Sequence, residues 1–160
     1  MLSRILSILQ ENARLTSGQI AERLGEDAAE VDRVLAEAET AGKIRGYRII
    51  TSDDVHPDDH VVSVVEVGLV PERDRGFDRI AERIARFPEV LSCALMSGSY
   101  DLLVTVKGRS LQTVASFVSE RLATIEGVRS TRTHFVLKRY KEDGVILFGE
   151  EEPTRLPVSP

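Results

Sequence analysis

The chain has 160 residues, of which 42% are hydrophobic and 29% charged, and its net charge is −5. These values are typical of a soluble globular protein with one domain or two small ones, and they exclude a disordered chain. No apolar run approaches the roughly 20 residues that cross a bilayer, and no signal-peptide layout opens the chain, so a cytoplasmic protein without membrane partners is expected. The single cysteine, Cys93, lies in an apolar segment, where we expect a core thiol and no disulfide.

The first part of the chain predicts three short helices. Apolar residues at helical spacing place the first over residues 2–12. A capping-box pattern opens the second, over 16–24, and a further start signal and a C-terminal glycine bound the third, over 28–41. A strand is predicted over 44–50. This order predicts a winged helix-turn-helix over residues 1–50, although a small helical domain of another purpose has the same pattern.

The remainder predicts an α+β domain after a linker at residues 51–60. The order strand, helix, strand occurs over residues 62–96 and again over 102–137. This duplication predicts a ferredoxin-like βαββαβ domain over residues 61–148, with an antiparallel four-stranded sheet and two helices on one face. The last residues, 149–160, form an acidic tail.

The first strand of this domain, residues 61–70, is apolar on both faces for most of its length. Because the two helices cover only one face, the other face needs a partner, and a second copy of the domain would supply it. We therefore expect a homodimer. Residues 145–148 are interpreted as an extra edge strand or as an arm that contacts the dimer partner.

Candidate DNA contacts gather around the second and third predicted helices. Residues 1–52 hold seven Lys or Arg against eight Asp or Glu, so DNA binding must depend on local charge placement. The third helix exposes mainly carboxylates, and carboxylates near phosphates weaken binding. A cluster of basic residues follows this helix and is suited to phosphates, although it could equally solubilise a strand. The predicted DNA-binding residues are Arg14, Thr16, Ser17, Arg23, Ala28, Ala29, Arg33, Lys43, Arg45 and Arg48.

A polar turn, residues 97–101, separates the two halves of the duplication. Its small and polar side chains either form a tight hairpin or, with two threonines of the last strand, line a pocket for a small zwitterion at a subunit interface. The predicted effector-binding residues are Met96, Ser97, Gly98, Ser99, Tyr100, Asp101, Thr131 and Thr133.

No catalytic signature is evident. The histidines His56, His60 and His134 are scattered, no spacing matches a metal site, and no glycine-rich phosphate loop follows a strand. We expect neither a metal nor a cofactor, and no enzymatic activity.

Taken together, several motifs resemble those of the Lrp/AsnC (feast/famine) transcriptional regulators, over residues 1 to about 141. The motifs are Ile20-Ala21 through Leu24-Gly25, the run Ala41-Gly42-Lys43-Ile44-Arg45-Gly46-Tyr47, the turn Gly98-Ser99-Tyr100-Asp101-Leu102, Gly127-Val128, and Thr131-Arg132-Thr133. The resemblance implies a winged helix joined to an amino-acid-sensing domain. It also implies dimers that assemble into tetramers or octamers, with a small effector, often an amino acid, between dimers.

Carried onto this sequence, the resemblance places the effector loop at residues 97–101 and the recognition helix at 28–41. Family members commonly have several basic residues in that helix, where this chain has Val34, Ala36, Glu37 and Thr40.

The leading functional hypothesis is a multimeric transcriptional regulator that responds to a small metabolite. Several weakly DNA-binding domains on one oligomer would raise the effective concentration at DNA. A metabolite sensor with little DNA affinity is an alternative, which the acidic helix favours. A third reading, an enzyme similar to the tetrapyrrole decarboxylases built on the same two-domain plan, would need Arg132 and His134 to point into a large pocket.

Overall fold

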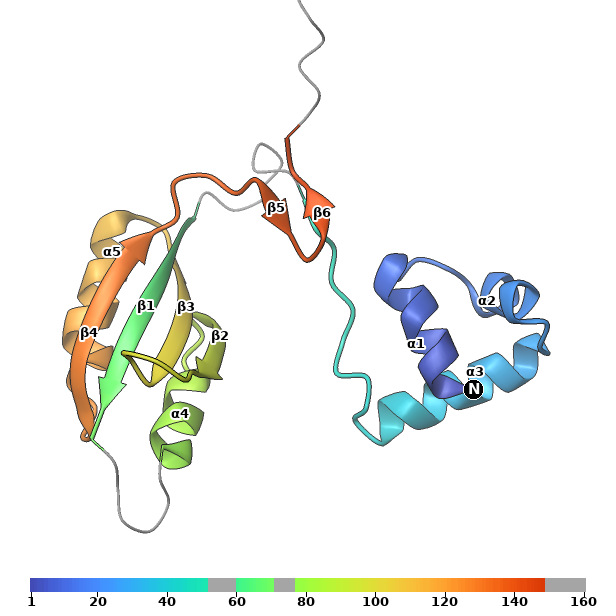
Figure 1. Cartoon of the computed structure of the whole chain (residues 1–160), viewed down its shortest axis with the longest axis horizontal. Coiled ribbons are helices and arrows are strands. Elements are labelled where there is room, and N and C mark those ends of the chain that lie inside the picture. Colours follow the sequence, from blue (N-terminus) through green and yellow to red (C-terminus); the bar gives the residue numbers. More distant parts are fainter. Residues whose placement is uncertain (52–59, 71–76, 149–160) are drawn as a thin grey trace, which may run out of the picture. The chain divides into compact units, whose positions relative to one another are not determined.

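The computed structural model describes residues 1–51, 60–70 and 77–148, and the chain divides between Ile50 and Thr51 into two compact units. We call residues 1–50 the helical unit and residues 51–160 the sheet unit (Figure 1). Most of the predicted linker and all of the acidic tail lie outside the described residues. Within the described part of the chain, no helix is long and apolar enough to pass through a membrane.

The helical unit contains the three predicted helices: α1 over Leu2–Glu11, α2 over Ser17–Leu24 and α3 over Ala28–Thr40. Each helix turns its apolar side inward, as the helical spacing predicts. The main buried cluster of the unit consists of Ile5, Leu9, Ile20, Ala21 and Val31.

The predicted strand over residues 44–50 is wrong, because residues 45–50 are irregular. A strand is stabilised by hydrogen bonds to a neighbouring strand, and no described strand pairs with this segment. The apolar residues of this segment therefore gain no cover from a sheet, and Ile49 is 81% exposed.

The sheet unit has the predicted ferredoxin-like topology. Its elements are β1 (Val61–Leu69), α4 (Asp78–Ala85), β2 (Val90–Leu95), β3 (Leu102–Gly108), α5 (Leu111–Ser116), a π-helix (Phe117–Leu122) and β4 (Val128–Phe135). The strands are antiparallel in the order β2-β3-β1-β4. The second helix was predicted as one continuous element, whereas its second half is a π-helix in which the Ala123 N–H donates to the Val118 carbonyl five residues earlier (2.8 Å).

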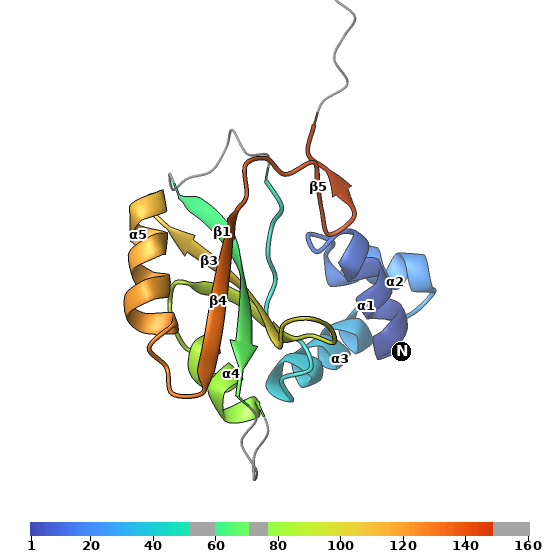
Figure 2. The same cartoon turned by 60° about the vertical axis from the view of Figure 1, so that its left-hand side comes forward.

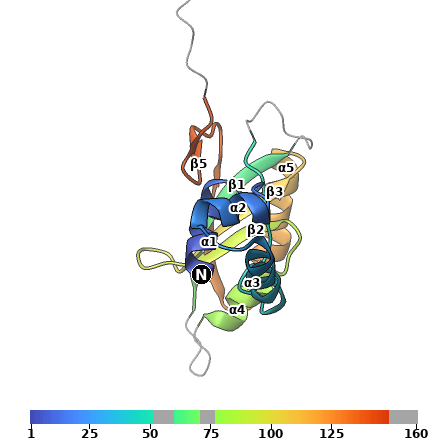
Figure 3. The same cartoon turned by 90° about the vertical axis from the view of Figure 1, so that its right-hand side faces the viewer.

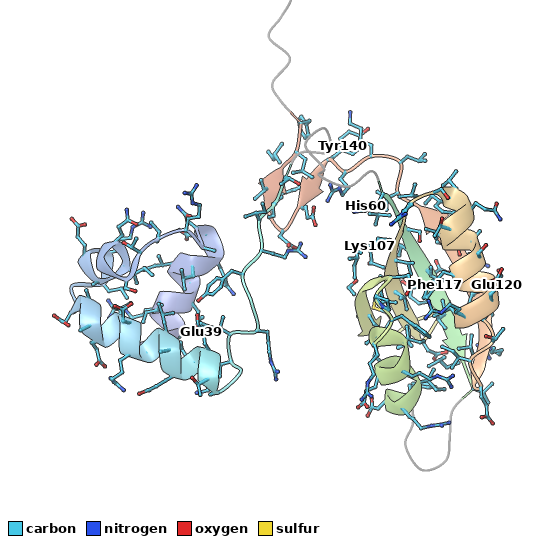
Figure 4. All side chains as sticks on the ribbon, turned by 180° about the vertical axis from the view of Figure 1, so that it is seen from behind. Glu39, His60, Lys107, Phe117, Glu120 and Tyr140 are labelled. Atoms are coloured by element: carbon cyan, nitrogen blue, oxygen red, sulfur yellow. The ribbon has the colours of Figure 1, made fainter. Side chains whose placement is uncertain are left out.

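The internal duplication is confirmed at the turns that lead into β2 and β4. The Val90 N–H donates to the Phe87 carbonyl at 3.0 Å, and the Val128 N–H donates to the Ile125 carbonyl at 2.9 Å. Each turn thus ends a helix and starts a strand with the same hydrogen bond. The aromatic ring of Phe87 packs edge-on against that of Phe117 in the other repeat; Phe117 is labelled in Figure 4.

Both helices cover one face of the sheet, and their apolar residues join the inward residues of β1 and β3 in a single core (Figures 1 and 4). Val65 and Val67 of β1 are fully buried on this face, whereas Val62, Val64 and Glu66 alternate with them on the opposite, open face and are half-buried. Cys93 of β2 lies on the helix side, but it is half-buried rather than fully in the core.

Residues 145–148 do not extend the main sheet, so the prediction of an edge strand is wrong. Val145–Ile146 forms β6, which pairs with β5 (Lys141–Glu142) in a separate two-stranded hairpin. The tight turn between them has left-handed backbone at Asp143 and Gly144, which brings β6 back onto β5. The alternative interpretation, an arm that contacts a partner, stays a prediction.

Candidate functional site

The turn between α2 and α3 is fixed by hydrogen bonds at both helix ends. Gly25 ends α2 in left-handed conformation with φ of 68°, and its N–H donates to the Ala21 carbonyl. Asp27 then caps α3, because its carboxylate accepts from the N–H groups of Ala29 (2.8 Å) and Glu30 (3.3 Å). This three-residue connection is a helix-turn-helix, in which α3 is the second helix.

Two hydroxyl groups, those of Thr16 and Ser17, form hydrogen bonds at the start of α2. Thr16 and Gln19 form the predicted capping box, in which the Gln19 N–H donates to the Thr16 hydroxyl and the Gln19 side chain accepts from the Thr16 N–H. The Ser17 hydroxyl donates to the Asp32 carboxylate on α3. The capping box thus fixes the start of α2, and the bond from Ser17 to Asp32 links α2 to α3.

The exposed side of α3 carries one cation between two carboxylates. The Arg33 guanidinium donates to both carboxylate oxygens of Glu30, at 2.6 and 2.9 Å, and to Glu37 one turn further along. The hydrogen bond from Arg33 holds the pKa of Glu30 below its usual range, and the two carboxylates raise that of Arg33. We call these three residues the Arg33 clamp.

The residues after α3 are fastened to the end of this helix. The Lys43 and Ile44 N–H groups both donate to the Ala38 carbonyl, and the Tyr47 hydroxyl donates to Glu39, which Figure 4 labels on α3. Burial and this hydrogen bond raise the pKa of Tyr47. Together with α1 the segment lines a groove of about 390 Å³, with an apolar floor and three basic residues: Lys43, Arg45 and Arg48.

In the sheet unit, the loop between β2 and β3 projects beyond the strands (Figures 2 and 3). Asp101 anchors it to β1, because its backbone N–H donates to Val67 (3.0 Å) and its carboxylate accepts from the Leu69 N–H (2.7 Å). The Met96 N–H closes the loop by donating to the Asp101 carbonyl. The loop is thus held at its base, and residues 97–99 are exposed.

A polar pocket of about 190 Å³ lies between this loop and the neighbouring strands β1 and β4. Its two charged lining residues come from the open sheet face, where Glu66 lies opposite Arg132 on the neighbouring strand. The Glu66 carboxylate lies 3.7 Å from the Arg132 guanidinium and 3.1 Å from His134 Nε2. The lining residues are Glu66, Gly68, Ser99, Tyr100, Ser130, Thr131 and Arg132.

Comparison with known proteins identifies both units. Residues 2–45 match the family model of a winged helix-turn-helix DNA-binding domain, and residues 62–146 match that of the Lrp/AsnC ligand-binding domain. The chain belongs to the Lrp/AsnC family. It is a DNA-binding transcriptional regulator with a ligand-binding domain.

Curated relatives and solved structures agree with this assignment. The chain is 42% identical to the uncharacterized HTH-type transcriptional regulator YugG of Bacillus subtilis, over 99% of this chain and 96% of YugG. It is 32% identical to the leucine-responsive regulatory protein of Rhizobium meliloti, over 87% of this chain and 88% of that protein. It also resembles the structure of transcriptional regulator NMB0573 from Neisseria meningitidis, solved as a complex with L-Met (29% identity, TM-score 0.68, 87% of this chain and 89% of that one).

The structure of this Lrp/AsnC protein distributes the predicted DNA-binding residues over three places. Ala28 and Ala29 form the exposed first turn of α3, Arg14 and Arg23 lie before and at the end of α2, and the three basic residues of the groove follow α3. The polar side chains of Thr16, Ser17 and Arg33 are engaged in the bonds described above.

Of the predicted effector-binding residues, the structure brings Ser99, Tyr100 and Thr131 together in the pocket. Asp101 anchors the loop, and Met96, Ser97 and Gly98 lie in or beside the loop without lining the pocket. Thr131 lies opposite Val67 and Thr133 opposite Val65, so the register places both threonines on the helix-covered side of the sheet. Thr131 lines the pocket and Thr133 does not.

Four pocket residues are absent from the predicted effector-binding set: Glu66, Gly68, Ser130 and Arg132. Glu66 did carry a signal, since it is the one charged residue in an otherwise apolar strand. Arg132 belongs to a motif that the sequence analysis named, but only the strand register shows that it lies opposite Glu66. No group of three or more His, Cys, Asp or Glu residues suited to a metal ion occurs in the described ranges.

Proposed function

We propose that this Lrp/AsnC regulator binds double-stranded DNA as a homo-oligomer, and that a free amino acid bound in the pocket of Ser99 and Arg132 alters its DNA occupancy. The observation that supports the effector most directly is the pairing of a carboxylate and a guanidinium at the wall of one small polar pocket. The solved relative in complex with L-Met supports the same class of ligand.

The chemistry of the pocket suits a zwitterion. A free amino acid carries a carboxylate, which an arginine binds through two parallel hydrogen bonds, and an ammonium group, which a carboxylate accepts. The Arg132 side chain is 75% exposed and stands 3.7 Å from Glu66, so the pair is loose and its two charges are available to a ligand. We infer that the ligand carboxylate binds the Arg132 guanidinium and the ligand ammonium binds the Glu66 carboxylate. The Ser99 and Ser130 hydroxyls complete the polar contacts.

The open face of the sheet supports self-association. It carries Val62 and Val64 of β1 and Leu103 of β3, and both helices of the unit pack on the other face. Beyond the sheet, Leu137 is 96% exposed and Phe148 is 54% exposed. Apolar surface of this kind is commonly covered by a partner, and a second copy of the same domain offers the same surface. We propose a homodimer, with further assembly into tetramers or octamers, in the cytoplasm.

We propose that the first turn of α3 enters the major groove of DNA. The three basic residues that follow α3, Lys43, Arg45 and Arg48, would contact the DNA phosphates. A single helical unit with so few cations binds weakly, and several units on one oligomer raise the effective concentration. The proposed activity needs no metal, no cofactor and no catalysis. The decarboxylase alternative lacks support, since the pocket is small and His134 does not line it.

The test is titration calorimetry of the full chain with L-Met first and then with each of the other amino acids. The free amino acid that binds should lose at least about tenfold in affinity when its carboxylate is amidated or its ammonium acetylated, because each change removes one charged contact. Glu66→Gln should weaken binding similarly, whereas the matched exposed control Glu82→Gln on α4 should not.

Two further measurements complete this test. Sedimentation should detect at least a dimer, and retention of DNA fragments should change when the bound amino acid is added. Equal binding of the free and acetylated ligands would reject the zwitterion pocket, and binding of none of the amino acids would reject the effector class.

A further inference from the structure

The Arg33 clamp occupies the side of α3 that a helix-turn-helix turns toward DNA. Arg33 reaches back to Glu30 and forward to Glu37, at i−3 and i+4, so its guanidinium lies along the helix instead of projecting from it. All three side chains are exposed, and Arg33 is 56% exposed. Nothing in the core of the helical unit requires this arrangement, because the buried residues of α3, Val31 and Ala38, lie on its other side.

The helix α3 carries four carboxylates and a single cation, and one of the carboxylates, Glu39, accepts from Tyr47. Asp32 is engaged with Ser17, which leaves Glu30 and Glu37 to neutralise Arg33 and to add one net negative charge. In the grooves of DNA this charge meets phosphates on both strands. Binding to arbitrary DNA depends on the number of phosphates that are neutralised, so the clamp weakens that binding most directly.

A guanine in the major groove interacts with Arg33 differently. Its O6 and N7 atoms accept two hydrogen bonds from one guanidinium, the commonest specific contact between an arginine and a base. A phosphate can also accept two hydrogen bonds from one guanidinium. Phosphates repeat at every step of the backbone, however, so a phosphate contact carries no sequence information. Exposed ion pairs such as those of Arg33 are weak enough for a bidentate contact to replace them.

We propose that Glu30 and Glu37 set the DNA selectivity of this regulator: they hold Arg33 against α3 on arbitrary DNA and release it to a guanine in the preferred site. The proposal rests on the DNA-binding function but is independent of the effector and of the pocket. Glu30 and Glu37 act through Arg33, and Arg33 is the residue that touches the base.

The test compares the full-length wild type with E30Q/E37Q on two duplexes of equal length and composition. One duplex is selected from a random pool with the wild type, and the other has the same bases in scrambled order. Dissociation constants are measured between 50 and 300 mM salt. The control is E82Q/E120Q, which changes the net charge equally but lies on α4 and on the π-helix of the sheet unit; Glu120 is labelled in Figure 4.

The clamp variant should bind the scrambled duplex about tenfold more tightly than the wild type, because the freed Arg33 gains a phosphate. The slope of log affinity against log salt should steepen by about 0.9 for each bound chain. Its preference for the selected duplex should fall, whereas the control should keep the wild-type preference. Replacing guanines of the selected duplex with 7-deazaguanine, which lacks N7, should weaken the wild type about fivefold and leave Arg33→Ala unaffected.

Each alternative outcome is decisive. An unchanged preference in E30Q/E37Q, with wild-type DNA binding intact, overturns the clamp and leaves the proposed function standing. Failure of the wild type and of the variant on every duplex overturns both. The single variant E37Q, which keeps the first turn of α3 unchanged, should show a smaller change in the same direction, and circular dichroism confirms that each variant is folded.

Discussion

The two units of this chain are stabilised in different ways. The helical unit has five residues in its buried cluster and depends on caps and on side-chain hydrogen bonds between segments. Ser17 of α2 donates to Asp32 of α3, and Tyr47 after α3 donates to Glu39. The sheet unit has thirteen buried residues in one cluster. Small units bury a smaller share of their surface, so their stability depends more on each individual contact. The comparison suggests that the DNA-binding unit is the more easily broken of the two.

Matched core truncations should show the largest difference between the units. Ile20→Ala in α2 and Ile84→Ala in α4 each remove a fully buried side chain and should cost about 2–5 kcal/mol. At about 0.05–0.15 kcal/mol per residue, a unit of this size has only a few kcal/mol of stability, so Ile20→Ala should unfold the helical unit near 37 °C. Hydrogen exchange resolved by unit measures this.

The sheet unit should stay folded in both variants and remain able to bind the effector. DNA binding should be lost only in Ile20→Ala. Equal losses of protection in both units after either substitution would show that they fold as one cooperative body, and the comparison would then fail.

A second contrast concerns a single carboxylate in the sheet unit. Asp101→Ala leaves the N–H of the buried Leu69, at the end of β1, without its acceptor and should destabilise the unit by about 1–3 kcal/mol. Asp101→Asn is the control, since its amide oxygen can still accept. Chemical denaturation measures the loss, and calorimetry should show weaker effector binding in the alanine variant, because the loop is no longer anchored.

Helix caps offer a matched pair with a smaller effect. Asp27 caps α3 of the helical unit, and Ser110 caps α5 of the sheet unit by accepting from the Thr113 N–H at 3.1 Å. Each alanine substitution should cost about 1 kcal/mol. Only Asp27→Ala should weaken DNA binding, measured by gel retardation, because α3 carries the proposed base contacts. If Ser110→Ala weakens DNA binding equally, the loss follows from general destabilisation rather than from α3.

Features that depend on neighbouring residues could be predicted from the sequence, and those that depend on distant partners could not. The helices of the first unit were predictable because Thr16, Gly25 and Asp27 act locally, through caps and turns that a few neighbouring residues determine. The duplication predicted the strand order because its two halves repeat the same turn. Segment 44–50 was misassigned because a strand depends on a partner that its own residues do not supply.

The pocket was predicted only in part for a related reason. Ser99 and Tyr100 belong to one recognisable turn, whereas Glu66 and Arg132 are 66 residues apart in the sequence and meet only through the register of β1 and β4. The alternation that places Arg132 on the open face also removes Thr133 from it. Likewise, the helical spacing showed which side of α3 is exposed, but not that Arg33 is bound by two carboxylates there.

Alkaline pH should produce the smallest effect on stability, and it should act on the two units through different groups, the Cys93 thiol and the Tyr47 hydroxyl. Burial raises the pKa of Cys93 in the sheet unit, and burial with the Glu39 hydrogen bond raises the pKa of Tyr47 in the helical unit. In each case the unfolded state loses its proton first as the pH rises, so unfolding becomes more favourable. The sheet unit should therefore lose stability from about pH 8.5 upward and the helical unit only from about pH 10, the ordinary pKa values of the two groups. Unfolding curves of Cys93→Ala and Tyr47→Phe between pH 7 and 11 check this, because each substitution should remove the decline in its own unit and leave the other unchanged.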